Sequence, residues 1–174
     1  SEKNLRKNGN VIRWSFLAII MAFSINAFIG QRTIIYGKSM EPCLQSGDNV
    51  IVEKVSRYLN DYNREEIILI QTSYGVFIKR IIGLPGETIR IDDTGRILID
   101  GKVYNDPYGD NSGEIYQGIA SSVIFLKDNE YFALGDNRDE SVDSRNPAVG
   151  IISKKNIIGK AVFRIYPFGK IGKI

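Results

Sequence analysis

A serine in a turn-forming segment is the first residue whose surroundings suggest chemistry. Ser39 lies between Gly37 and Pro42, and glycine and proline favour a bent backbone. A serine hydroxyl becomes a nucleophile only when a neighbouring base takes its proton. The chain contains no histidine, which excludes a Ser-His-Asp triad. A lysine or a carboxylate must therefore be the base.

Lys79 is the candidate for that base. It lies in an apolar segment, 74–82, in which strand alternation places Phe77 and Ile81 on the same face. Burial beside apolar groups disfavours the charged form of lysine, and neutral lysine can accept a proton. The alternative is a lysine on an edge strand with its amine in water, and the segment alone leaves both open.

A third segment, from Gly135 to Arg145, is unusually dense in polar residues. It could be a solvated surface loop. It could also be a hydrogen-bonded scaffold in which Asp143 and Arg145 form an ion pair and Ser141 orients an amine.

Composition excludes several other classes of protein. Cys43 is the single cysteine, and without histidine the chain offers no imidazole or cysteine-cluster metal site. We expect no metal and no cofactor. The first thirteen residues carry the whole net charge of +3, which leaves a neutral body and argues against nucleic-acid binding.

Residues 11–30 form an apolar run that would span about 30 Å as a helix. We expect one transmembrane anchor, with the basic tail 1–10 in the cytoplasm and the rest outside. A buried core helix is one alternative. A cleavable signal peptide cut near Ala22-Phe23-Ser24 is another, although that cut would fall inside the run. The anchor would hold Ser39 near the membrane surface.

The remaining 31–174 is predicted to be an all-β catalytic domain, mainly antiparallel and barrel-like, with a hairpin and loop insertion at about 92–130. Short apolar or alternating runs are bounded by turn residues throughout. Residues 55–59 suggest a short helix and 105–118 a loop. The predicted strands are 49–53, 66–71, 74–82, 87–92, 97–99, 102–104, 123–126, 131–134 and 157–165.

Four segments, in this order and spacing behind an apolar span, resemble the successive motifs of the bacterial type I signal peptidases. The resemblance covers nearly the whole chain. The motifs are Gly37-x-Ser39-Met40-x-Pro42, Gly47-Asp48-x-Val50-x-Val52-x-Lys54, Lys79-Arg80-Ile-Ile-Gly83-Leu-Pro-Gly86 and Gly135-Asp136-Asn137-x-x-x-Ser141-x-Asp143-Ser144-Arg145.

The resemblance implies a membrane-anchored serine–lysine endopeptidase that removes signal peptides from exported preproteins, at a bacterial-type plasma membrane or a thylakoid membrane. It implies that Ser39 is the nucleophile, with its backbone N–H as an oxyanion donor, and that Lys79 is the general base. It further implies that Ser141 positions the amine and that Asp143 and Arg145 brace the loop.

The resemblance also implies that the substrate binds as an added β-strand between 33–36 and 76–78. Small residues are then expected at the first and third positions before the cut, and membrane lipid is a second partner. We expect large apolar residues to wall the pockets: Ile35, Met40, Leu44, Phe77 and Ile78.

Two residues depart from the family pattern. Gly37 stands where some members have a serine that donates to the oxyanion, and Cys43 replaces the usual threonine. Two other functions are considered. One is a self-cleaving repressor-type protease, which would carry a DNA-binding domain where this chain has its apolar run. The other is a membrane-anchored β module without catalysis.

Overall fold

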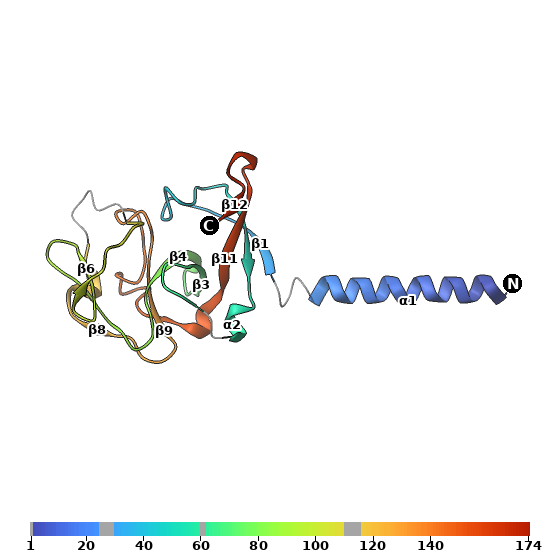
Figure 1. Ribbon diagram of the computed structural model, residues 1–174, viewed down its shortest axis with the longest axis horizontal. Helices are drawn as coiled ribbons and strands as arrows, with labels where there is room; N and C mark the ends of the chain where they lie inside the picture. Colours follow the sequence, from blue (N-terminus) through green and yellow to red (C-terminus); the bar gives the residue numbers. More distant parts are fainter. Residues whose placement is uncertain (1, 25–29, 60–61, 110–115) are drawn as a thin grey trace.

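The computed structural model describes residues 2–24, 30–59, 62–109 and 116–174 and consists of an N-terminal helix followed by antiparallel sheets (Figure 1). Helix α1 covers Glu2–Ser24. No helix in the described part of the chain is both long enough and apolar enough to cross a membrane. The side chains described on α1, residues 11–22, are all exposed.

The bounds of the first helix differ from the prediction of 11–30. The helix begins at Glu2, so the predicted tail is mostly helical, because Glu, Lys, Leu and Arg favour a helix. Gly30, expected at the end of the span, is instead the first residue of a strand. Residues 25–29 of the predicted anchor lie outside the described residues.

The larger sheet has eight strands in the order β1-β2-β11-β3-β4-β9-β10, with β12 paired to β11. Every pairing in it is antiparallel. Among the described strands this path is open, since β1 and β10 are its unjoined ends. The bounds are β1 Gly30–Ile34, β2 Asn49–Glu53, β3 Ile67–Thr72, β4 Gly75–Gly83, β9 Glu130–Leu134, β10 Ile152–Ser153, β11 Ile157–Tyr166 and β12 Gly172–Lys173.

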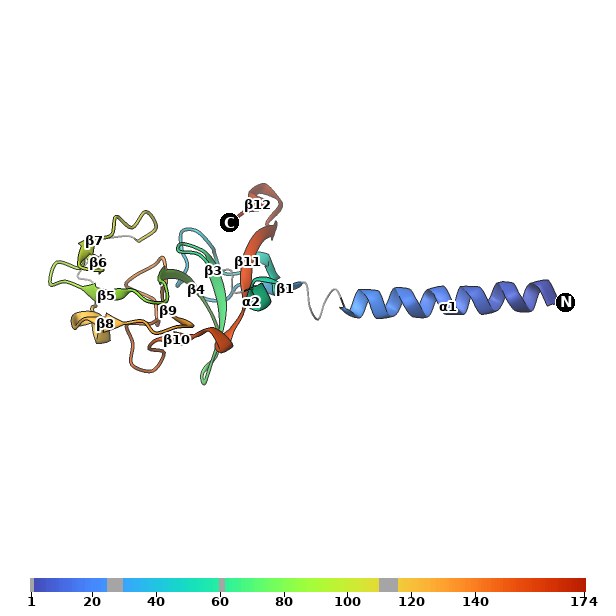
Figure 2. The same cartoon turned by 60° about the horizontal axis from the view of Figure 1, so that its bottom comes forward.

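A smaller four-stranded sheet, ordered β7-β6-β5-β8, lies at the end of the domain away from α1 (Figure 2). It corresponds broadly to the predicted insertion at 92–130, but it begins earlier, with β5. Its strands are β5 Thr88–Ile91, β6 Ile97–Ile99, β7 Lys102–Val103 and β8 Ile124–Phe125.

Short helices connect the strands. α2, Ser56–Leu59, is the helical turn expected at 55–59, and it follows β2 on the side of the domain where β1 lies. Three 3-10 helices, Gly118–Ser121, Lys154–Asn156 and Phe168–Lys170, occupy other connections.

The core follows from the position of β3. This strand lies between β11 and β4, and its residues from Ile67 to Ile70 are all buried. An apolar run without alternation is what a strand covered on both faces requires. One face packs on a cluster that contains Met40, Leu44 and Leu69, and the other on a cluster around Tyr131 and Ile157. The first cluster supports the segment that carries Ser39.

Candidate active site

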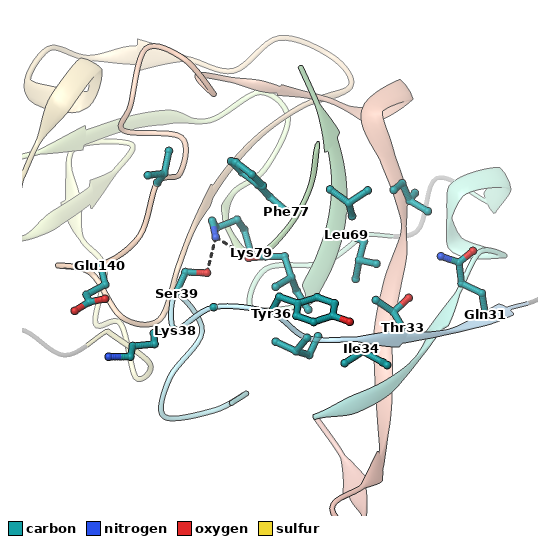
Figure 3. A pocket seen from close by; sticks show the side chains of 16 residues that line it. Gln31, Thr33, Ile34, Tyr36, Lys38, Ser39, Leu69, Phe77, Lys79 and Glu140 are labelled. Carbon is teal, nitrogen blue, oxygen red and sulfur yellow. Dashed lines mark hydrogen bonds between the residues drawn. The ribbon is translucent and has the colours of Figure 1, made fainter. Parts of the chain in front are cut away.

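Ser39 and Lys79 meet although forty residues separate them. Lys79 Nζ lies 2.7 Å from Ser39 Oγ (Figure 3). The same amine donates a hydrogen bond of 2.9 Å to the carbonyl oxygen of Ile78. With one N–H directed at that carbonyl, the amine can direct another N–H, or its lone pair when it is neutral, at the Ser39 hydroxyl.

Ser39 is held by the loop between β1 and β2. Ile35 joins the two sides of this loop, because its N–H donates to Asp48 O at 2.8 Å and its carbonyl accepts from Gly47 N at 2.9 Å. Gly37 has φ of 84°, a value that glycine adopts without strain. Asn137 N–H donates to Ser39 O at 3.1 Å. The loop is therefore fixed at its base and beside the serine.

Lys79 lies in the middle of β4 and is only 3% exposed. Burial lowers the pKa of its amine to about 8, against smaller upward effects of Asp143 and Asp136 and a downward effect of Arg145. Its Nζ lies 5.5 Å from the centre of the Phe77 ring. A substantial fraction of this lysine is thus neutral in mildly alkaline solution, as a general base must be.

The two carboxylates that influence Lys79 each have their own arginine. Asp143 pairs with Arg145 at 2.9 Å and also accepts from Gly135 N at 3.1 Å. Asp136 is bound by Arg80. Because both charges are neutralised locally, the amine forms no ion pair with any described carboxylate. These ion pairs make the polar segment 135–145 a hydrogen-bonded scaffold in which Asp136, Asp143 and Arg145 are buried.

Ser141 lies beside Gly135, close to the backbone of Ser39, but it does not make the hydrogen bond to the amine that the resemblance implies. Its Oγ is buried and has no hydrogen-bond partner among the described residues. It packs against Gly135, where an added Cβ would lie 2.2 Å from Ser141 Oγ and 2.4 Å from Ser39 O. The amine donates to the Ile78 carbonyl instead, which lies on its own strand.

A groove of about 480 Å³ opens beside Ser39 and Lys79. It runs from Gln31 in β1 to Glu140 beyond the serine (Figure 3). Its lining residues are mostly apolar, and they are Gln31, Thr33, Ile34, Ile35, Tyr36, Gly37, Lys38, Ser39, Leu69, Val76, Phe77, Ile78, Lys79, Glu140, Val142 and Ile158.

Three of the five predicted wall residues, Ile35, Phe77 and Ile78, line this groove. Met40 and Leu44 do not, which corrects the prediction for both. They are at most 1% exposed and pack in the core below the loop, because Leu44 N–H bonds to Met40 O in a helical turn that directs both side chains inward.

The groove also contains wall residues that the sequence did not reveal. Leu69 lies opposite Ile78 in the β3–β4 ladder, and Ile158 belongs to the adjoining strand β11. Pairing the apolar run of β3 with β4 in register would have located Leu69. Ile158, Glu140 and Val142 reach the groove through long-range contacts that no local pattern encodes.

Cys43 is free and partly buried. Its backbone carbonyl accepts a hydrogen bond of 2.7 Å from Arg164, so this residue is tied to β11 rather than to the groove. The described residues contain no group of three or more histidine, cysteine, aspartate or glutamate side chains arranged to hold a metal ion.

Comparison with known proteins gives a consistent family. Residues 9–166 match the family model described as signal peptidase, peptidase S26. A signal peptidase I of Bacillus licheniformis is 32% identical over 99% of this chain and 97% of its own. One from Bacillus amyloliquefaciens is 33% identical over 99% and 96%. A solved signal peptidase I from Enterococcus faecalis is 27% identical, covers 57% of this chain and 96% of its own, and has a TM-score of 0.47.

Proposed function

We propose that this chain, which belongs to the signal peptidase family, removes signal peptides from preproteins with Ser39 as nucleophile and Lys79 as general base. The observation that supports this assignment most is the 2.7 Å separation of Lys79 Nζ and Ser39 Oγ at the wall of an apolar groove. The sequence contains no histidine, and the titratable group that hydrogen-bonds to Ser39 Oγ is the Lys79 amine.

In the proposed reaction the neutral Lys79 amine takes the Ser39 proton as Oγ attacks the carbonyl carbon of the scissile peptide bond. The backbone N–H of Ser39 stabilises the oxyanion. The protonated amine then gives its proton to the leaving nitrogen, and the C–N bond breaks. Lys79 next takes a proton from water, which attacks the acyl-enzyme ester, and the proton returns to Ser39 Oγ as the ester C–O bond breaks.

The free edges of two strands support the proposed substrate pose. Thr33 pairs with Val50 on one side of β1 only, and no described strand covers the other side. In β4, the partner β9 pairs with Arg80, Ile81 and Gly83, which leaves the outer edge of 76–78 without a strand. An extended peptide can add to these edges, directing its alternate side chains into the groove.

The shape of the groove supports small residues at the first and third positions. Leu69, Ile78 and Ile158 are large side chains close below the peptide path, so they leave shallow pockets. Alanine fills such a pocket, whereas leucine would overpack it.

We also propose that the N-terminal apolar segment anchors the domain at a membrane, with the N-terminus in the cytoplasm. Exposed apolar side chains on α1, including Trp14, Phe16 and Ile19, support this. The proposal predicts that the full chain stays with membranes in alkaline carbonate. It also predicts that external protease digests the domain in intact spheroplasts. Release by carbonate would contradict the anchor.

Preprotein cleavage by the purified full chain tests the proposed function. Wild type should release a product whose new N-terminus follows a small-x-small sequence. Ser39→Ala and Lys79→Ala should each lower turnover by several orders of magnitude. Lys102→Ala, at an exposed lysine in the smaller sheet, is the control and should cleave normally. Normal turnover by folded Lys79→Ala would contradict the mechanism.

A further inference from the structure

A basic hollow lies beside α2, between that helix, the turn before β9 and the segment from β10 into the 3-10 helix that follows it. It has a volume of about 360 Å³ and is lined by Arg57, Asn129, Ser153, Lys154 and Lys155. Three cationic side chains therefore converge on one concave site. We propose that this hollow binds the phosphate of anionic membrane lipids and seats the domain on the bilayer surface.

The hollow carries positive charge without a close acidic partner in the described part of the chain. Arg57, Lys154 and Lys155 form no ion pair there. Of the carboxylates close in sequence to the lining residues, Glu53 lies 4.0 Å from Lys160 Nζ, Glu130 accepts from Lys127 N at 2.8 Å, and Asp128 is exposed to solvent. Cations gathered in one hollow repel one another until an anion occupies it. Phosphate oxygens are suitable acceptors for these donors.

Exposed apolar side chains flank Arg57 on and just before α2. Tyr58 and Leu59 are 63% and 68% exposed, and Val55 precedes them at 38%. A short element that presents basic groups together with an aromatic and aliphatic residues is suited to the interface between headgroups and acyl chains. A soluble anion would have no use for these exposed apolar groups, which is why we assign the hollow to lipid.

The chain also keeps this face near the end of α1. Gly30, the first residue of β1, pairs with Glu53, and α2 begins three residues later at Ser56. From Ser24 to Gly30 the chain reaches at most about 20 Å. If α1 leads into the bilayer, as proposed above, α2 cannot lie far from the headgroups. The inference rests on that part of the proposed function and adds the lipid class.

Hydrogen exchange of the full chain in vesicles tests the inference. Amides of 56–59 and 153–156 should exchange several-fold more slowly in phosphatidylcholine vesicles containing phosphatidylglycerol than in phosphatidylcholine alone. Replacing Arg57, Lys154 and Lys155 with glutamine should remove this difference, because each basic group near an anionic surface changes binding by about fivefold. A matched triple variant, with Lys102, Lys170 and Lys173 changed to glutamine, should keep it.

Three results would overturn the inference. Equal exchange in the two vesicle types would show that anionic lipid does not occupy the hollow. Equal loss in the matched triple variant would reduce the effect to general charge attraction. The same protection by inorganic phosphate with phosphatidylcholine vesicles would assign the hollow to a soluble anion. The variant with glutamine at Arg57, Lys154 and Lys155 should cleave preprotein in detergent as fast as wild type. Cleavage in detergent needs no bilayer, so it tests the proposed function separately from lipid binding.

Discussion

The Arg80 guanidinium holds the Asp136 carboxylate with two hydrogen bonds, of 2.8 and 2.6 Å, one residue along β4 from Lys79. Both side chains are at most 3% exposed. Arg80 also donates to Glu65 O at 2.7 Å and lies 3.6 Å over the Tyr108 ring. This pair joins the strand that carries Lys79 to the polar segment behind Ser39.

Breaking that pair should destabilise the protein strongly. Arg80→Met leaves the Asp136 carboxylate buried without its partner, which costs about 3–5 kcal/mol. Replacing both residues, with Arg80→Met and Asp136→Leu together, should cost less than Arg80→Met alone. Urea unfolding measures both effects. A single variant as stable as wild type would show that the pair carries little stability.

Gly135→Ala should reduce turnover severely, because the added methyl meets Ser141 Oγ and Ser39 O within 2.4 Å. Ser39 O is a backbone atom that accepts a hydrogen bond from Asn137 N. The Ser39 loop must therefore shift, and a displacement of about 1 Å can cost a hundredfold in rate. Gly169→Ala is the matched control, since its methyl would have no neighbour within 4 Å. Comparable kcat values for the two variants would disprove the tight packing behind Ser39.

If Ser141 orients the Lys79 amine, as the family resemblance implies, Ser141→Ala should lower kcat more than it raises KM, while stability changes by less than about 1 kcal/mol. Its buried hydroxyl has no described partner to lose, and an unpaired buried hydroxyl contributes no stability. Steady-state kinetics combined with thermal unfolding separates the two effects. An unchanged kcat would remove Ser141 from the positioning of the amine.

Leu69→Ala should broaden the specificity of cleavage. Removing this side chain from the groove deepens a pocket, so preproteins with valine or leucine at the first or third position should become substrates. Met40→Ala is a useful comparison, because Met40 is buried and does not line the groove. It should cost about 2–5 kcal/mol in stability and leave specificity unchanged. A preprotein series with each position varied measures both, and identical specificity in Leu69→Ala would contradict the assigned pocket.

The sequence predicted the elements whose signals are local. β3 and β4 are apolar runs closed by turn residues, and both were located within a residue or two. β1 was missed because Gly-Gln-Arg-Thr-Ile has neither an apolar run nor strong alternation, and it becomes a strand only by pairing with β2.

The same distinction applies to the candidate site. Turn residues, the absence of histidine and the motif order predicted that Ser39 and Lys79 would meet, and they lie within hydrogen-bonding distance. Met40 was misplaced because its direction depends on the helical turn after the serine. Ile158 was missed because only the long-range pairing of β11 with β3 brings it near the groove.

The pH dependence of kcat/KM tests the central claim most directly. Burial lowers the pKa of Lys79 to about 8. Below this pH the amine is protonated and cannot take the serine proton, so activity should rise through about pH 8 and level off above it. Lys79→Arg should be inactive across the range, because guanidinium stays protonated. A flat profile with chemistry rate-limiting, or turnover by Lys79→Arg, would contradict lysine as the general base.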